Sequence, residues 1–262
     1  MTLLAYRLDG AGPPVLLLNG IMMSMAAWEP VARDLAVDHL VIRCDLRGQL
    51  LSPGPAPEEM ATHAEEVVQV LDALRLDAVH VAGTSFGSLV GLTLAAMYPA
   101  RVTSLVAMTT TERADDSMQP LFESLRDASA KAAAGGDKGL VFDLIVPYTF
   151  SPEWQAGHGD ALRERREAVG RLPREWFSSF AGLLESTRGV DLRPLLGQIV
   201  CPTLVVGAER DLLFPVEHSR ALAAAIQGAR FQIVAGGSHG LVVERPEEVA
   251  ALVRGFVEES VS

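Results

Sequence analysis

Short apolar runs alternate along the chain with longer segments in which apolar residues recur at helical spacing. Six continuous runs rich in Val, Leu and Ile predict strands buried on both faces, at Val15–Leu18, Leu40–Cys44, Ala78–Ala82, Val102–Met108, Thr203–Val206 and Arg230–Val234. Helices are predicted between them, at Ala26–Leu35, Glu58–Leu74, Phe86–Met97, Glu217–Ile226 and Pro246–Glu258. This alternation predicts an α/β fold with a mostly parallel sheet flanked by helices.

The alternation is interrupted between about Ala114 and Gly189. Only helices are predicted there, at Met118–Ala134, Lys138–Ile145, Ala161–Leu172 and Glu175–Thr187, with turns at Gly135–Gly136 and at Pro147. We interpret this stretch as a helical lid, inserted before the strand Thr203–Val206. The predicted organisation is therefore a core formed by residues 1–113 and 190–262, with residues 114–189 as the lid.

The predicted lid is rich in aromatic side chains. It holds 8 of the chain's 15 aromatic residues, namely Phe122, Phe142, Tyr148, Phe150, Trp154, Trp176, Phe177 and Phe180. A share proportional to length would be about 4. Two interpretations follow: the lid needs a small core of its own, or some of these rings line an apolar substrate pocket.

Charge and composition exclude some classes of function. The formal net charge is −11, from 22 basic and 33 acidic residues, which disfavours a nucleic-acid partner. No run of about 20 apolar residues exists, so we expect no membrane span. We also expect a cytoplasmic monomer or homodimer with two buried free thiols, Cys44 and Cys201, acting on a small molecule without a metal or organic cofactor.

Ser85 is the first candidate for chemistry. It lies between Gly83 and Gly87, in the pattern G-x-S-x-G, where a predicted strand passes into a predicted helix. A sharp turn there would project the hydroxyl out of the sheet, beside the positive N-terminus of the helix. Because glycine is common in this chain, the pattern alone does not identify a nucleophile. A serine nucleophile also needs a base, an acid that orients the base, and donors for the developing oxyanion.

The sequence offers an acid and a base in suitable loops. Asp211 follows the strand Thr203–Val206, and His239 follows the last strand, within Gly236-Gly237-Ser238-His239-Gly240. Both loops are expected at the carboxyl edge of the sheet, where α/β proteins bind ligands. The alternatives that remain open are Glu209, Glu112 and Asp115 for the acid, and His158 for the base. The other histidines are interpreted as packing or surface residues.

With the order Ser85, Asp211, His239, the chain resembles the α/β-hydrolase superfamily. The matching stretches are LLLNGIMMS, DLRGQLLS, VAGTSFG, GAERDLLFP and GGSHG, and the resemblance covers nearly the whole chain. Within it, the chain looks like a member of the serine esterase, lactonase and C–C hydrolase branch, and its Asn19-Gly20 pair resembles the variant in 3-oxoadipate enol-lactonase-like and some methylesterase-like members. The resemblance implies an oxyanion hole formed by the backbone N–H groups of Ile21 and Phe86, following the pair Asn19-Gly20.

One loop departs from the pattern of that family. The family often reads D-x-R-G-x-G-x-S, whereas residues 45–52 of this chain read DLRGQLLS. Leu50 therefore replaces a common glycine, and Gln49 stands where histidine is common. The backbone path of this loop is left open by the sequence.

The function predicted from these residues is hydrolysis by a serine hydrolase. The substrate is expected to be a carboxylic ester or lactone of a small, largely apolar molecule, cleaved through an acyl-enzyme on Ser85. Met22, Met23, Phe214 and Leu241 are expected to line the substrate pocket. The alternatives are a thioesterase or C–C bond hydrolase with the same triad, a cofactor-free perhydrolase, and a non-catalytic ligand-binding protein.

Overall fold

A seven-stranded sheet forms the centre of the protein in a computed structural model, which describes residues 2–114 and 116–261. The strands are β1 (Tyr6–Asp9), β2 (Pro14–Leu18), β3 (Leu40–Cys44), β4 (Val79–Thr84), β5 (Val102–Met108), β6 (Thr203–Ala208) and β7 (Arg230–Val234). Their order in the sheet is β1-β3-β2-β4-β5-β6-β7. All neighbouring strands pair in parallel except β1 and β3, which are antiparallel. The predicted α/β fold with a mostly parallel sheet is thus confirmed.

Strand β1 is the strand that the apolar pattern did not predict. Its sequence is YRLD, and its two large apolar side chains, Tyr6 and Leu8, are exposed. The strand lies at the edge of the sheet and pairs with β3 through its backbone. A strand held by backbone hydrogen bonds with little burial leaves no continuous apolar run to detect.

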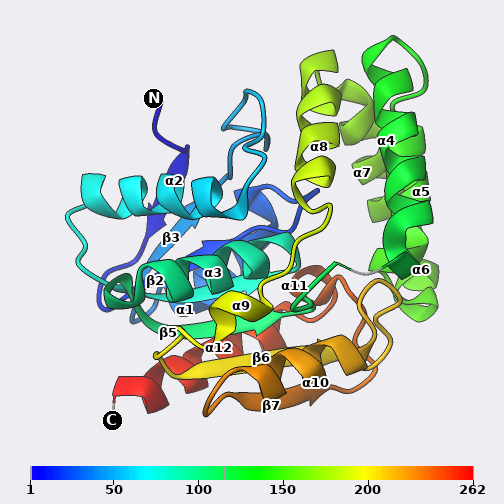
Figure 1. Cartoon of the computed structure of the whole chain (residues 1–262). Coiled ribbons are helices and arrows are strands. Elements are labelled where there is room, and N and C mark those ends of the chain that lie inside the picture. Colours follow the sequence, from blue (N-terminus) through cyan, green and yellow to red (C-terminus); the bar gives the residue numbers. More distant parts are fainter. Residues whose placement is uncertain (1, 115, 262) are drawn as a thin grey trace.

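Helices cover both faces of the sheet (Figure 1). One face carries α2 (Met60–Ala73), α3 (Phe86–Met97), α9 (Arg193–Leu196) and α10 (Val216–Ala225), and the other carries α1 (Glu29–Leu35), α11 (Leu241–Glu244) and α12 (Pro246–Val261). Side chains of β2 alternate between the two cores, with Leu16 and Leu18 on the first face and Val15 and Leu17 on the second. Short 3₁₀ helices lie at Met25–Trp28, Pro99–Arg101 and Asp116–Met118.

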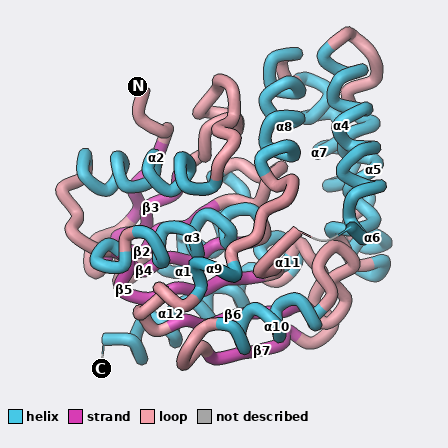
Figure 2. Tube along the Cα trace, viewed as in Figure 1, coloured by secondary structure: helices cyan, strands magenta, loops and turns pink. Residues whose placement is uncertain are grey.

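Helices α4 to α8, which lie between β5 and β6, stand as a group over one end of the sheet (Figure 1). They are α4 (Gln119–Ala133), α5 (Gly139–Thr149), α6 (Pro152–Gly157), α7 (Gly159–Arg171) and α8 (Arg174–Ser186), and we call them the helical segment. Leu125, Phe177 and Phe180 are buried in a core of this segment, which Leu213 from the loop after β6 completes. Figure 2 shows loops between the sheet and these helices.

The turn predicted at Pro147 is wrong, because this residue lies inside α5. Proline lacks an N–H group, so it costs the helix one hydrogen bond without preventing the next turn. The helix continues to Thr149, where the Phe150 N–H donates to the Val146 carbonyl at 3.0 Å. Helix α6 was also not predicted, since it is only six residues long.

Within residues 2–114 and 116–261, no helix combines the length and the apolar character needed to cross a membrane.

Candidate functional site

Ser85 occupies a strained turn between β4 and α3. Its backbone angles are φ 53° and ψ −117°, a region that residues with a side chain rarely adopt. The end of the neighbouring strand holds this conformation: the Ser85 N–H donates to the Met108 carbonyl at 2.9 Å, and the Thr110 hydroxyl donates to the Ser85 carbonyl at 3.2 Å. The surrounding hydrogen bonds thus stabilise a turn that the serine would not adopt alone.

The two glycines of the pattern are required by close backbone contacts. A Cβ atom on Gly83 would lie 2.6 Å from the carbonyl carbon and oxygen of Gly87. A Cβ atom on Gly87 would overlap the Leu18 carbonyl oxygen and lie 2.7 Å from that of Asn19. Helix α3 can therefore pack against the end of β2 only if both positions lack a side chain.

Asp211 and His239 are brought together by the loops after β6 and β7. The Oδ2 atom of Asp211 lies 2.9 Å from Nδ1 of His239, and the Asp211 side chain is buried. The other carboxylate oxygen, Oδ1, accepts hydrogen bonds from the backbone N–H groups of Leu213 and Phe214, both at 2.8 Å. Because the Asp211 carboxylate accepts a hydrogen bond, it favours the His239 tautomer that is protonated on Nδ1. The other ring nitrogen, Nε2, is then free to accept a proton.

The alternative acids have other contacts. Glu209 is exposed, and its Oε2 atom accepts a hydrogen bond from the Gly236 N–H at 2.7 Å. Glu112 accepts a hydrogen bond from the Thr111 hydroxyl at 3.3 Å. Asp115 lies outside the described residues. In the described part of the chain, Asp211 is thus the candidate acid that contacts His239.

The alternative base, His158, is exposed between α6 and α7. Its ring stacks on Trp154 with 4.1 Å between centroids, and Nδ1 contacts the Trp154 carbonyl at 2.8 Å. His63, interpreted as a surface or packing residue, is fully buried on α2 and contacts the Phe86 ring edge-on at 5.1 Å. Burial lowers the pKa of His63 to about 4.

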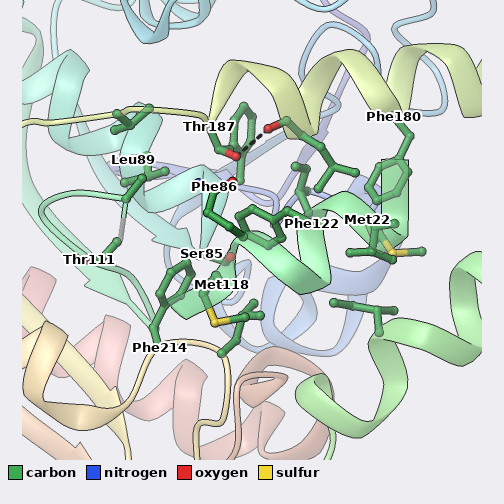
Figure 3. Close-up of a pocket in the computed structure, with 18 residues that line it drawn as sticks. Met22, Ser85, Phe86, Leu89, Thr111, Met118, Phe122, Phe180, Thr187 and Phe214 are labelled. Atoms are coloured by element: carbon green, nitrogen blue, oxygen red, sulfur yellow. Dashed lines mark hydrogen bonds between the residues drawn. The ribbon is translucent and has the colours of Figure 1, made fainter. Parts of the chain in front are cut away.

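A cavity between the sheet and the helical segment contains Ser85 (Figure 3). The side chains of Met118, Phe122 and Phe214 surround Ser85 in this view. Polar lining residues are Ser85, Thr111, Gln119 and Thr187, and the lining contains no Lys or Arg. The volume of the cavity is about 50 Å³.

Phe214 connects the cavity with the acid and base pair. It lines the cavity together with Ser85, and its ring centroid lies 5.6 Å from that of His239. The strands that precede Ser85, Asp211 and His239 are parallel, so the three loops leave the sheet at the same edge. The structure therefore gathers the three predicted residues around one end of the sheet.

The predicted pocket residues divide into two groups. Met22 and Phe214 line the cavity, whereas Met23 and Leu241 do not. Leu241 is fully buried in the core beneath α12, because the loop after β7 turns into α11 at this residue. The Met23 sulfur lies 3.3 Å from the Gly20 nitrogen and accepts a hydrogen bond from the Gly20 N–H group.

Several lining residues were not singled out in the sequence. Helices α4 and α8 contribute the apolar side chains Phe122, Leu125, Phe180 and Leu184. The excess of aromatic residues in the helical segment was the available signal, and it could not separate Phe122 and Phe180 from the six other rings. Phe180 fits both interpretations of the aromatic excess, a substrate pocket and a small core of the segment, because it lines the cavity and is also buried in that core.

The candidate oxyanion donors lie on either side of Ser85. Phe86 is the first residue of α3, so its N–H belongs to the helical turn that has no acceptor within the helix. The Ile21 N–H makes no hydrogen bond to another described residue. A Cβ atom on the adjacent Gly20 would lie 3.7 Å from the Cβ of Ser85, which places this loop against the serine.

Metal-binding side chains do not gather in the described part of the chain. Among residues 2–114 and 116–261, no group of three or more His, Cys, Asp or Glu side chains is arranged so that it could hold a metal ion.

Comparison with known proteins places this chain in a family. Residues 13–145 match the sequence profile of the alpha/beta hydrolase fold. The chain is 30% identical to RutD of Azorhizobium caulinodans, a proposed carbamate hydrolase, over 98% of this chain and 95% of that protein. Among solved structures, it resembles MGS-M2, an alpha/beta hydrolase from a Medee basin deep-sea metagenome library (TM-score 0.89, 25% identity, 97% and 94% coverage). It also resembles the enol-lactonase of Burkholderia xenovorans LB400 (TM-score 0.85, 26% identity, 97% and 96% coverage). The chain is therefore a hydrolase that belongs to the alpha/beta hydrolase fold family.

Proposed function

We propose that this protein is a serine hydrolase that cleaves a neutral carboxylic ester or lactone of a small, largely apolar molecule. The observation that carries the proposal is the contact between the buried Asp211 carboxylate and His239. Phe214 lies beside the His239 ring and also lines the cavity that contains Ser85. A strained serine, an oriented imidazole and backbone donors are the parts that acyl transfer requires.

The reaction proceeds in two steps. His239 Nε2 takes the proton of the Ser85 hydroxyl as its oxygen attacks the substrate carbonyl, and Asp211 stabilises the imidazolium that forms. The N–H groups of Ile21 and Phe86 stabilise the oxyanion. His239 then protonates the leaving oxygen as the acyl group is transferred to Ser85; the alcohol of an ester departs, whereas the hydroxyl or enol of a lactone stays attached to the acyl group. Finally His239 activates a water molecule, which releases the acid and restores the serine.

The lining of the cavity supports a neutral substrate. Most lining residues are apolar, and a free anion placed there would lose its hydration without meeting a Lys or Arg among them. The bulky side chains of Phe122 and Phe180 in the lining favour a short acyl group. The structural resemblance to an enol-lactonase supports a lactone as one substrate class.

Carbamate hydrolysis is the second candidate. The observation that favours it is the 30% identity to a proposed carbamate hydrolase over nearly the whole chain. The same residues could attack a carbamate carbonyl, forming a carbamoyl-serine in place of an acyl-serine. A neutral carbamate ester suits the apolar lining better than an anionic free carbamate does.

The test of the proposal is the Ser85→Ala variant. Turnover of short p-nitrophenyl esters should fall by at least about 10³-fold, because no other group replaces the nucleophile. Circular dichroism should show an unchanged fold. The control is Ser124→Ala, which removes an exposed hydroxyl on α4 whose bond is to the Pro120 carbonyl. Undiminished turnover in Ser85→Ala would exclude the assignment.

Substrate class is tested with a panel. Initial rates of the wild-type protein on matched esters, lactones, thioesters and neutral carbamates rank the candidates directly. We expect esters or lactones of short acyl groups to be the best substrates. A higher kcat/KM for carbamates would favour the second candidate. Mass spectrometry after treatment with a fluorophosphonate should locate a covalent adduct on Ser85.

A further inference from the structure

The buried side chain of Gln49 links two loops behind the candidate oxyanion hole. Its Oε1 atom accepts hydrogen bonds from the Leu46 N–H at 2.8 Å and from Asn19 Nδ2 at 3.0 Å. Its Nε2 atom donates to the Gly20 carbonyl oxygen at 2.8 Å. Gln49 is 2% exposed, so these contacts are shielded from water. Both ends of the amide are used, and its orientation follows from its partners, because Leu46 N–H can only donate and the carbonyl can only accept.

The bond to Gly20 controls the direction of the next N–H group. In a trans peptide the C=O of one residue and the N–H of the next point in opposite directions. The Gly20 carbonyl is held by Gln49 Nε2 and by the Met23 N–H at 3.0 Å. The Ile21 N–H of the same peptide must therefore point away from Gln49. It has no hydrogen-bond partner among the described residues, and the loop lies against Ser85.

The residues around Gln49 hold it in place. Asn19 Nδ2 also lies 3.0 Å from the Cys44 carbonyl oxygen and from Asp45 Oδ1, and all of these groups are buried. Asp45 in turn accepts hydrogen bonds from the N–H groups of Met25 at 2.6 Å and Leu51 at 2.8 Å. The network thus connects the ends of β2 and β3, and a rotation of the Gly20–Ile21 peptide would break several of its bonds.

We propose that Gln49 is a positioning residue, which orients the Gly20–Ile21 peptide so that the Ile21 N–H stabilises the oxyanion formed at Ser85. The inference rests on the proposed acyl transfer and extends it to a residue that does not touch the substrate. An amide suits this position because it presents an acceptor and a donor at once, and it does so at any pH at which the enzyme works.

Two variants separate the donor from the rest of the side chain. Gln49→Met keeps the length and removes every hydrogen bond. Gln49→Glu, assayed at pH 8, keeps an acceptor for Leu46 and Asn19 but lacks the donor to Gly20. Both should lower kcat for a short p-nitrophenyl ester by roughly 10- to 100-fold, with KM changed less than about threefold, because an oxyanion donor acts on the transition state.

A second measurement distinguishes positioning from a purely structural role. Affinity for a trifluoromethyl ketone, which forms an oxyanion on serine, should fall by about the same factor as kcat, whereas affinity for the product acid should stay within about threefold. The control is Leu50→Ala on the same loop, where the side chain is 43% exposed; its kcat should stay within twofold. The proposal is overturned if Gln49→Met folds and keeps kcat and ketone affinity within twofold of wild type.

Hydrogen exchange tests the same idea without any substrate. Peptides that cover residues 19–25 should exchange faster in Gln49→Met and Gln49→Glu than in the wild-type protein, and unchanged exchange would also overturn the positioning role. The two proposals can fail separately. If Ser85→Ala retains turnover, the proposed function is wrong while the exchange result still reports on the loop. If Ser85 is essential and the Gln49 variants are unaffected, only the positioning role is wrong.

Discussion

Leu50 stands where a glycine is common in the related family, but its backbone does not adopt the positive φ that would favour glycine. In this loop the left-handed conformation belongs to Gly48, with φ 93°. Among described non-glycine residues, positive φ occurs at Arg75, Ser85 and Thr109, and Leu50 is not one of them. Its side chain points into solvent. Leucine at this position therefore does not strain the loop, and Gln49 and Asp45 of the same loop contact the residues that follow β2.

His63 gives a prediction about pH at the scale of one residue. Its pKa is about 4 in the folded protein because of burial, against an ordinary value of 6.5. Between these values the unfolded chain binds a proton that the folded protein does not, so acid favours unfolding. The free energy of unfolding should fall as the pH decreases from about 6.5 to 4, by up to about 3 kcal/mol from this group.

The His63 contribution can be isolated by substitution. In His63→Leu, urea unfolding measured at intervals from pH 4.5 to 7.5 should show a shallower loss of stability on acidification than in the wild-type protein. His158→Leu is the matched control, since it makes the same substitution at an exposed ring. Equal slopes for His63→Leu and wild type would contradict the prediction.

At the scale of elements, the helical segment and the loop that carries His239 are joined by hydrogen bonds. The Thr149 carbonyl at the end of α5 accepts hydrogen bonds from the Gly240 N–H at 2.7 Å and the Ser238 hydroxyl at 2.8 Å. The Glu244 carboxylate of α11 accepts a hydrogen bond from the Ser151 N–H at 2.6 Å. The segment therefore provides two things: it walls the cavity through α4 and α8, and it supports the loop that carries His239 through α5.

The wall formed by α4 sets the size of substrate that we expect. Phe122→Ala should enlarge the cavity next to Ser85 and raise kcat/KM for longer acyl esters relative to acetate by about tenfold or more. The measurement is the ratio of kcat/KM for butyrate or hexanoate to that for acetate. Phe142→Ala on α5 is the matched control, because Phe142 is half-buried and does not line the cavity. An unchanged ratio in Phe122→Ala would place the acyl group elsewhere.

At the scale of the whole molecule, the two connections that lead into and out of the helical segment meet. The Ala114 N–H donates to the Val190 carbonyl at 2.7 Å, and the Leu192 N–H donates to the Glu112 carbonyl at 2.9 Å. Arg113 and Asp191 form an antiparallel bridge at the same place. A segment that leaves and returns at one point can be inserted without altering the sheet, because β5 and β6 remain neighbours.

Excision of the helical segment tests this organisation. Replacing residues 116–188 with a short Gly-Ser linker should leave an α/β core that unfolds cooperatively, at a lower temperature than the full chain. Leu213 and Phe214 should become exposed and bind a hydrophobic dye, since they pack against the segment. Turnover of short esters should fall at least about tenfold, because the wall of the cavity is lost. Absence of a cooperative transition would show that the core and the segment form one folding unit.

Much of the fold was predictable because buried parallel strands leave a strong apolar signal. Six of the seven strands were predicted close to their observed bounds, and α3 matches at both ends, Phe86 and Met97. The edge strand β1 and the short helices α6 and α11 were not, since each has too few residues or too little burial to show a period. The candidate triad was predictable because each residue lies in a loop that directly follows a strand.

Pocket residues were harder to predict, because the loop path decides which side chains face the cavity. Met22 and Met23 are neighbours, yet only Met22 lines it, since the Met23 sulfur turns back to the Gly20 N–H. Leu241 follows His239 closely, yet it is buried in the core on the far side of the sheet from α3. The direction of a side chain in an irregular loop depends on tertiary contacts, and no periodic pattern in the sequence predicts it.

The sequence by itself determined the α/β architecture, the presence of helices between β5 and β6, and the order of the candidate residues Ser85, Asp211 and His239. These depend on local periodicity and on glycines that short-range sterics require. Only the tertiary structure decided that Asp211 contacts His239, that Phe122 and Phe180 reach the cavity, and that Gln49 holds the Gly20 carbonyl. These contacts join residues that are distant in the chain. The polar contacts among them form because burial leaves each polar group with few available partners.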